Sequence, residues 1–221
     1  IKVRRFIVRR DDYVAGTSKS LLNCNFMSIY IPPDYFRELH REEIFPDATR
    51  PLEVELGCGD GTFFLCMAQQ HPERDFLGLE RMLGRVSKTS RKVNRTGLTN
   101  AKVLRLESSY SVGWLLPTAS VSRLHLLCPD PWPKKKHAAR RLVNQEEFLT
   151  GLARILVPGG EFLLKTDDAV YFEDALLSLS SRPEFERLDW PEDAFFYPTT
   201  DFEAHWLSMG RSMNRARWRR R

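Results

Sequence analysis

Short apolar runs alternate with longer amphipathic stretches along most of this chain, beginning at residue 52. The apolar runs have the length of buried strands, and they cover residues 52–56, 75–80, 101–106, 121–128 and 161–166. The stretches between them suit helices near residues 61–70, 82–95, 145–156 and 170–180. Such alternation predicts an α/β fold with a doubly wound, mostly parallel sheet and helices on both faces. The right-handed crossover rule places the carboxyl ends of the strands along one edge, where such sheets bind ligands.

The two ends of the chain lack this alternation. Residues 1–30 have no clear period and predict an arm with a short strand at residues 6–8, and residues 34–43 predict a short helix. Six of the last eleven residues are arginine, which predicts a basic tail over residues 214–221. We therefore expect an arm and linker over residues 1–50, a folded domain over residues 51–213, and the tail. Because the chain opens on Ile1 rather than Met, we also expect residues upstream of it.

Composition narrows the class of protein. The 221 residues are 42% hydrophobic and 29% charged, which is typical of a globular domain and excludes a wholly disordered chain. No apolar run approaches the ~20 residues of a membrane span, and no signal peptide is visible, so we expect no membrane association. Lysine and arginine number 34 against 29 acids, and they cluster near the start, in residues 134–141 and at the end. Such clusters favour a polyanionic partner, most commonly nucleic acid.

The cysteines and histidines give no metal-binding pattern. Cys24, Cys58, Cys66 and Cys128 have spacings that match no Cys-x-x-Cys motif, and the five histidines are scattered. We therefore expect no metal site. Reduced thiols are the economical interpretation, and they predict a cytoplasmic protein.

A glycine-rich turn follows the first predicted strand. Gly57, Gly59 and Gly61 let the backbone turn sharply and let a ligand lie against the main chain, although a tight turn without a ligand is the alternative. The spacing is not the Gly-x-Gly-x-x-Gly of dinucleotide-binding folds. Glu80 closes the next strand, where a carboxylate can accept hydrogen bonds from a ribose diol. Glu55 would repel a pyrophosphate but suits the ammonium of S-adenosylmethionine, which we therefore favour over NAD.

Two further acids follow strands at the same predicted edge. Glu107 follows the third strand and could accept from an adenine amino group, or be a plain surface acid. Asp130 lies in the segment Pro-Asp-Pro-Trp-Pro-Lys-Lys-Lys-His, whose prolines stiffen the backbone. Its carboxylate can accept from the N1–H and amino group of guanine, Trp132 can stack on a base, and Lys134 can pair with a phosphate. The alternative is a rigid turn with Trp132 simply buried.

Together these motifs resemble those of a known family. Glu-Leu-Gly-Cys-Gly-Asp-Gly, Gly-Leu-Glu, the Pro-Asp-Pro-Trp segment and the late Thr-Asp-Phe-Glu are similar to motifs of bacterial tRNA (guanine-N7-)-methyltransferases, over roughly residues 50–213. The resemblance implies a class I (Rossmann-like) methyltransferase fold with a seven-stranded sheet. It also implies methyl transfer from S-adenosylmethionine to N7 of a guanosine in the variable loop of tRNA. The cofactor contacts that we expect are Glu55, Gly57, Gly59, Gly61, Glu80, Glu107 and Asp130. Asp130 matches the catalytic residue, and the implied substrate contacts are Lys134, Asp167, Thr200, Asp201, Phe202 and Glu203.

Several positions depart from the family's pattern. Glu107 stands where the family usually has aspartate, and Cys58 and Cys128 stand where phenylalanine is common. Asp201 replaces the lysine of Thr-Lys-Phe-Glu, which removes one positive charge from the RNA side.

Alternatives remain open for some residues and for the function. Asp167 could instead cap the helix after it, Glu203 could be a surface acid, and Phe202 and Trp206 have the character of core residues. An NAD-dependent oxidoreductase and a non-catalytic RNA-binding protein of the same fold are the rival functions. We expect the terminal arginines and residues 134–136 to form the RNA footprint, so that binding weakens steeply with salt. We expect tRNA as the partner, no obligate protein partner, and a monomer or homodimer.

Overall fold

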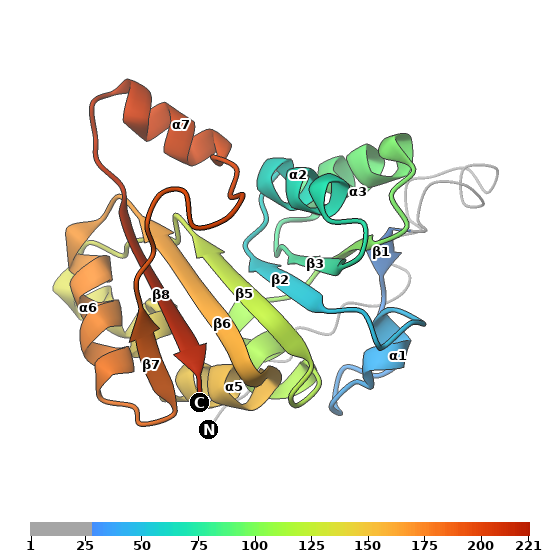
Figure 1. Cartoon of the computed structure of the whole chain (residues 1–221), viewed down its shortest axis with the longest axis horizontal. Coiled ribbons are helices and arrows are strands. Elements are labelled where there is room, and N and C mark those ends of the chain that lie inside the picture. The colour runs from blue at the N-terminus through green and yellow to red at the C-terminus, as the bar shows by residue number, and fades with distance from the viewer. Residues whose placement is uncertain (1–27) are drawn as a thin grey trace.

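The computed structural model describes residues 28–221, so the strand predicted at residues 6–8 lies outside the described part of the chain. One sheet of eight strands runs through the molecule (Figure 1). Its strands are β1 (Ile29–Tyr30), β2 (Leu52–Leu56), β3 (Asp75–Leu79), β4 (Ala101–Leu104), β5 (Val121–Leu127), β6 (Leu156–Thr166), β7 (Phe185–Leu188) and β8 (Asn214–Arg220). The α-helices are α1 (Arg41–Ile44), α2 (Thr62–Gln70), α3 (Leu83–Thr96), α4 (Ser108–Tyr110), α5 (Glu146–Ile155), α6 (Ala169–Ser180) and α7 (Asp201–Ser208). Within residues 28–221, no helix is long and apolar enough to cross a membrane.

The strand order is β1-β4-β3-β2-β5-β6-β8-β7, which confirms the doubly wound arrangement predicted from the sequence. β8 is antiparallel to β6 and to β7, and the other neighbouring strands are parallel. The five predicted strands and the four predicted core helices are all present, although β6 begins at Leu156 rather than at residue 161. The sheet has eight strands rather than seven, because the two-residue β1 pairs with β4 at one edge.

Two apolar clusters hold helices against the sheet. In the larger cluster, Val54 of β2 and Phe162 of β6 share a core with Phe148 of α5 and Tyr171 of α6. In the smaller cluster, α2 and α3 pack on β3 and β4. Side chains alternate between the two faces of each strand, so both faces of a strand can be buried at once. The helices thereby fix the strands whose ends carry the candidate site.

The loops that follow β2, β3, β5 and β6 emerge along one edge, because these four strands are parallel. α7 stands beyond this edge, at the end of the sheet that also carries α2 (Figure 1). The glycine-rich turn, the Pro-Asp-Pro-Trp segment and the Thr200–Glu203 segment are therefore brought to one end of the molecule.

Residues 214–220 form an internal strand, so the prediction of a basic tail is wrong. Buried apolar residues and arginines alternate at positions 215–219, and the high arginine content made this strand pattern hard to recognise. Trp218 is only 2% exposed and stacks on Phe162 with a centroid distance of 5.5 Å, whereas Arg217 points to the opposite face and pairs with Glu161. The segment belongs to the sheet because Ala216 and Trp218 face the core, while Arg217 and Arg219 pair with acids on neighbouring strands.

Residues 28–50 also pack into the main unit rather than forming a separate arm. Ile44 belongs to the larger core cluster, and the buried Arg41 pairs with the buried Asp75 at 2.6 Å. The helix predicted over residues 34–43 is reduced to the single turn of α1. The apolar positions before α1 have helical spacing, but only Leu39 is buried, and Phe36 is 81% exposed. That face is therefore not buried as a whole and does not stabilise a longer helix.

Candidate active site

The glycine-rich turn joins β2 to α2 and leaves space above its backbone. Gly57, Gly59 and Gly61 have φ angles of 69°, 58° and 81°, a region that glycine occupies without steric cost. A Cβ at Gly61 would lie 2.4 Å from Cγ2 of Thr89, so α3 packs directly against this end of the turn. A Cβ at Gly57 would meet no atom within 4 Å. The turn is therefore closed on the α3 side and open at Gly57, as a ligand lying on the main chain requires.

Glu80 holds this turn in place. One oxygen of its buried carboxylate accepts from the Gly59 amide at 3.2 Å, and the other accepts from the Met82 amide at 2.7 Å. Glu80 thus links the glycine-rich turn to the start of α3. Each carboxylate oxygen can accept more than one hydrogen bond, so capacity remains for a diol.

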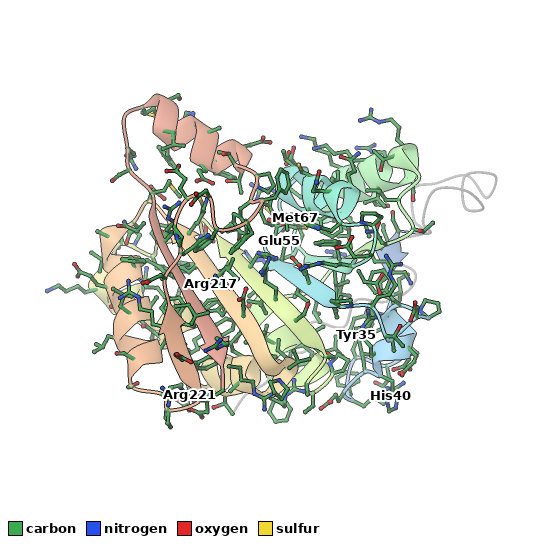
Figure 2. All side chains as sticks on the ribbon, viewed as in Figure 1. Tyr35, His40, Glu55, Met67, Arg217 and Arg221 are labelled. Atoms are coloured by element: carbon green, nitrogen blue, oxygen red, sulfur yellow. The ribbon has the colours of Figure 1, made fainter. Side chains whose placement is uncertain are left out.

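Glu55 lies near the carboxyl end of β2 and is 6% exposed (Figure 2). Its Oε2 is buried and has no hydrogen-bond partner among the described residues. Burial, followed by the nearby charges of Asp60 and Glu80, raises the pKa of Glu55 from 4.5 to about 8. A backbone hydrogen bond from Phe64 opposes this rise. A buried carboxylate oxygen without a partner is costly in free energy, and a cationic ligand group would relieve this cost.

The Glu107 side chain caps a helix in the free protein. It is exposed, and its two carboxylate oxygens accept from the backbone amides of Ser109 at 3.0 Å and Tyr110 at 2.8 Å. Glu107 is therefore the N-cap of α4. Its predicted contact with an adenine amino group stays a prediction, and it would have to use the remaining acceptor capacity of the capping carboxylate.

The Pro-Asp-Pro-Trp segment follows β5 and leads into the 3₁₀ helix η4 (Lys135–Arg140). Asp130 and Lys134 are both exposed. Trp132 is half-buried, because the Arg140 guanidinium lies 4.8 Å from its ring centroid and the His137 ring packs edge-on at 5.8 Å. The segment therefore presents an acid, a ring and lysines together at the edge where β5 and its parallel neighbours end.

The Thr200–Glu203 segment starts α7, and most of its polar groups are engaged within the protein. Thr200 Oγ1 caps the helix by accepting from the Glu203 amide at 3.0 Å. Glu203 is buried and pairs with the buried Lys165 of β6 at 2.7 Å, so the surface-acid alternative is wrong. Asp201 accepts a hydrogen bond from Thr62 of α2 at 3.0 Å. The segment therefore ties α7 both to the sheet and to the glycine-rich turn.

Three other expectations at this edge need correction. Phe202 is 55% exposed and Trp206 is half-buried beneath the Arg211 guanidinium, so neither is a core residue. Asp167 pairs with Arg211 at 3.1 Å, and the neighbouring Asp168 is the N-cap of α6. The capping alternative for Asp167 is therefore wrong, while its substrate contact stays a prediction.

A buried polar chain lies beside Glu55, and the sequence reading missed it. His125 is buried between two partners: its Nε2 lies 2.9 Å from Glu53 Oε2, and its Nδ1 lies 2.8 Å from the Tyr197 hydroxyl. The His125 and Arg123 side chains hold the pKa of Glu53 at about 2, against the opposing effect of burial. This chain anchors the segment before α7 to the sheet. The sequence signal for it was Glu53, a second acid within the buried strand β2.

The fold is that of class I methyltransferases. A 16S rRNA (adenine(1408)-N(1))-methyltransferase from Catenulisporales acidiphilia, solved with its cosubstrate SAM, superposes with a TM-score of 0.56 at 16% identity. The match covers 83% of this chain and 92% of that one.

Sequence relatives define the family more narrowly. The family model described as "Putative methyltransferase" matches residues 49–216. The tRNA (guanine-N(7)-)-methyltransferase of Syntrophotalea carbinolica is 37% identical over 167 residues, covering 74% of this chain and 72% of that protein. The enzyme of the same name from Rhodospirillum rubrum is 31% identical over 221 residues, covering 96% and 86% respectively. This chain therefore belongs to the tRNA (guanine-N(7)-)-methyltransferase family, and the oxidoreductase alternative is not favoured.

Proposed function

We propose that this chain transfers a methyl group from S-adenosylmethionine to N7 of a guanosine in the variable loop of tRNA. Membership of the family supports the reaction and the substrate class. The structural observation that carries the proposal is Glu55, a buried carboxylate with an unpartnered oxygen beside a glycine-rich turn that is open at Gly57. Because tRNA is the substrate, we place the enzyme in the cytoplasm.

The residues around the turn suit S-adenosylmethionine better than a dinucleotide. Glu55 would bind the ammonium of the amino-acid end, and Glu80 would bind the ribose diol. The open face of Gly57 would let the cofactor lie against the backbone. A pyrophosphate would bring negative charge toward Glu55 and Glu80, which disfavours NAD. S-adenosylmethionine supplies an electrophilic methyl group on a cationic sulfur.

Asp130 would orient the guanine and stabilise its charge. Guanine N7 carries a lone pair and no proton, so the reaction requires no general base and depends on alignment. The Asp130 carboxylate would accept hydrogen bonds from N1–H and from the exocyclic amino group. When N7 gains the methyl group, the guanine becomes cationic, and the negative charge of Asp130 stabilises that cation.

We assign the RNA-binding surface to the lysines next to Asp130 rather than to the terminal arginines. Lys134, Lys135 and Lys136 are exposed and form no ion pair with other described residues, so we assign them to phosphates. Two of the terminal arginines are already paired with acids of the protein: Arg217 pairs with Glu161, and the exposed Arg219 pairs with Glu186. The lysines next to Asp130 are therefore better placed to bind RNA than the arginines of β8.

Replacement of Asp130 by asparagine tests the catalytic assignment. We expect kcat for methyl transfer to tRNA to fall by at least about 100-fold with an unchanged melting temperature, because an exposed charge that stabilises the transition state is lost. Asp189→Asn is the matched control, since Asp189 is an exposed acid that follows β7 at the same edge of the sheet. Near-wild-type turnover in Asp130→Asn would falsify the assignment.

A further inference from the structure

The loop that carries Asp130 has an unfavourable backbone conformation on both sides of this residue. Cys128 and Trp132, which flank it, have φ angles of 46° and 45°, in the left-handed region that non-glycine residues avoid. The prolines at positions 129, 131 and 133 have no backbone N–H to donate. Asp130 forms no hydrogen bond or ion pair with the other described residues. The position of its carboxylate must therefore be set through the backbone.

Arg141 contacts that backbone on the carboxyl-terminal side of Asp130. Its guanidinium is buried, with the residue 4% exposed. Nε donates to the carbonyl oxygen of Pro131 at 2.8 Å, and Nη2 donates to that of Trp132 at 3.3 Å. At the other end of the loop, the Cys128 amide donates to the Lys165 carbonyl of β6 at 2.8 Å. The loop is thus fixed at both ends, and Arg141 is the only side chain that holds the far end among the hydrogen bonds of residues 28–221.

Asp174 fixes Arg141 in turn. Nη1 of Arg141 donates to Oδ2 of Asp174 at 2.6 Å, and the same oxygen accepts from Nδ2 of Asn144 at 2.6 Å. Asp174 belongs to α6, which packs in the larger core cluster. The connection therefore runs from α6 through an ion pair between the half-buried Asp174 and the buried Arg141 to the two residues that follow Asp130. A planar guanidinium can serve all three acceptors at once, whereas a lysine ammonium lacks this fixed fork geometry.

We propose that Arg141, held by Asp174, is a positioning residue for methyl transfer: it fixes the backbone at Pro131 and Trp132 and so sets where the Asp130 carboxylate meets the guanine. The inference rests on the proposed function, because that function assigns Asp130 to the guanine. Methyl transfer needs N7, the methyl carbon and the sulfur in line, and a displacement of about 1 Å can cost about 100-fold in rate. Loss of Arg141 should therefore lower kcat, while the cofactor site at Glu55 and Gly57, which Arg141 does not contact, is unaffected.

Arg154 provides a matched control within the same protein. Its guanidinium also joins two backbone carbonyls to one acid: Leu116 at 2.8 Å, Val112 at 3.0 Å and Glu38 at 2.9 Å. Arg154 lies in the last turn of α5, and its carbonyl accepts from Ala119, just before β5 begins. It therefore braces the opposite end of β5 from the Asp130 loop. Loss of the arginine removes the same kinds of hydrogen bond at both positions, although Arg154 is half-buried where Arg141 is buried. A purely structural effect should therefore appear at both positions, whereas an effect on alignment should appear only at Arg141.

The experiment compares Arg141→Ala and Arg154→Ala with the wild type in methyl transfer to tRNA, with and without millimolar guanidinium added to fill the vacated position. We expect Arg141→Ala to lose about 100-fold in kcat, with KM for tRNA and Kd for S-adenosylmethionine within about threefold of wild type. Guanidinium should restore at least about a tenth of the lost kcat. Arg154→Ala should lose melting temperature but keep kcat, and guanidinium should not raise its rate. Asp174→Asn should lower kcat in the same sense as Arg141→Ala.

A second readout does not depend on activity. Backbone hydrogen exchange in residues 128–137 should speed up in Arg141→Ala and stay unchanged in Arg154→Ala. Arg141→Lys replaces the alanine variant in this comparison if the alanine variant does not fold. Lysine keeps a positive charge next to Asp174 but lacks the planar guanidinium that donates to both the Pro131 and the Trp132 carbonyl. Unchanged kcat, or a loss of kcat with neither rescue nor faster exchange in this loop, would overturn the inference. Absence of tRNA methylation by the wild type would instead refute the proposed function, and hydrogen exchange would still decide whether Arg141 holds the loop.

Discussion

At the scale of single residues, the acids of the candidate site differ in how the free protein holds them. Glu80 and Glu107 both accept backbone hydrogen bonds, which fix their positions in the free protein. Glu55 is different, because its Oε2 is buried and unpartnered among the described residues. Its raised pKa, about 8, means that the carboxyl group is largely protonated at neutral pH before a ligand arrives. Binding of a cationic ligand group should therefore be linked to release of a proton.

Proton release tests this assignment of Glu55. The pKa is about 8 in the folded free protein and 4.5 ordinarily, so between these values the folded state holds a proton that the unfolded chain has lost. Stability of the free protein should therefore fall as pH rises through this window. Binding of S-adenosylmethionine should favour the charged carboxylate, so affinity should rise with pH up to about 8.

Calorimetric titration at pH 7, in buffers with different heats of ionisation, measures the released proton directly. We expect about one proton released per site in the wild type and none from this group in Glu55→Gln. Equal proton release in the two proteins would show that Glu55 does not bind the ammonium.

Some residues of the candidate site could be predicted from the sequence, whereas their long-range partners could not. Glu55, Glu80 and Asp130 could be named because local spacing places an acid just after or within a strand that ends at the binding edge. The partners of Glu203 and Asp201 could not be named, because Lys165 is 38 positions away and Thr62 is 139 positions away. Contacts over such separations depend on how α7 is laid over the edge of the sheet, and no local pattern encodes that placement.

At the scale of elements, the alternating part of the chain was predictable and its ends were not. Each of the five predicted strands is a short apolar run, and burial of such a run dominates any other local preference. β8 was not predicted as a strand. Arginine dominates its composition, and only Ala216 and Trp218 face the core. The arginines of β8 are compatible with a central strand because acids of β6 and β7 lie opposite them.

Trp218→Ala tests the internal position of β8. Trp218 is fully packed against Phe162, so we expect the free energy of unfolding to fall by about 3–5 kcal/mol, through lost burial and the cavity left behind. Leu177→Ala is the control, since Leu177 is 73% exposed on α6 and should change stability by less than about 0.5 kcal/mol. Urea unfolding of both variants measures the difference. A loss below about 1 kcal/mol for Trp218→Ala would be the behaviour of a tail rather than a strand.

At the scale of the whole molecule, the described residues form one unit with its chemistry at one end. The strand at the start of that unit, β1, and the strand at its end, β8, both join the same sheet (Figure 1). Thr62, which follows the glycine-rich turn, donates a hydrogen bond to Asp201 of α7, so the proposed cofactor side and the proposed substrate side are in direct contact. Domain boundaries based on composition missed this, because composition reports charge and not the pairing of strands.

The measurement that tests the central claim most directly is methyl transfer from labelled S-adenosylmethionine to two unmodified tRNA transcripts. One transcript carries the variable-loop guanosine, and the other carries adenosine at that position. We predict label in the first transcript only, recovered as 7-methylguanine. Label in both transcripts would contradict the assigned position, and label in neither, with no cofactor-induced rise in melting temperature, would contradict the cofactor and the reaction together.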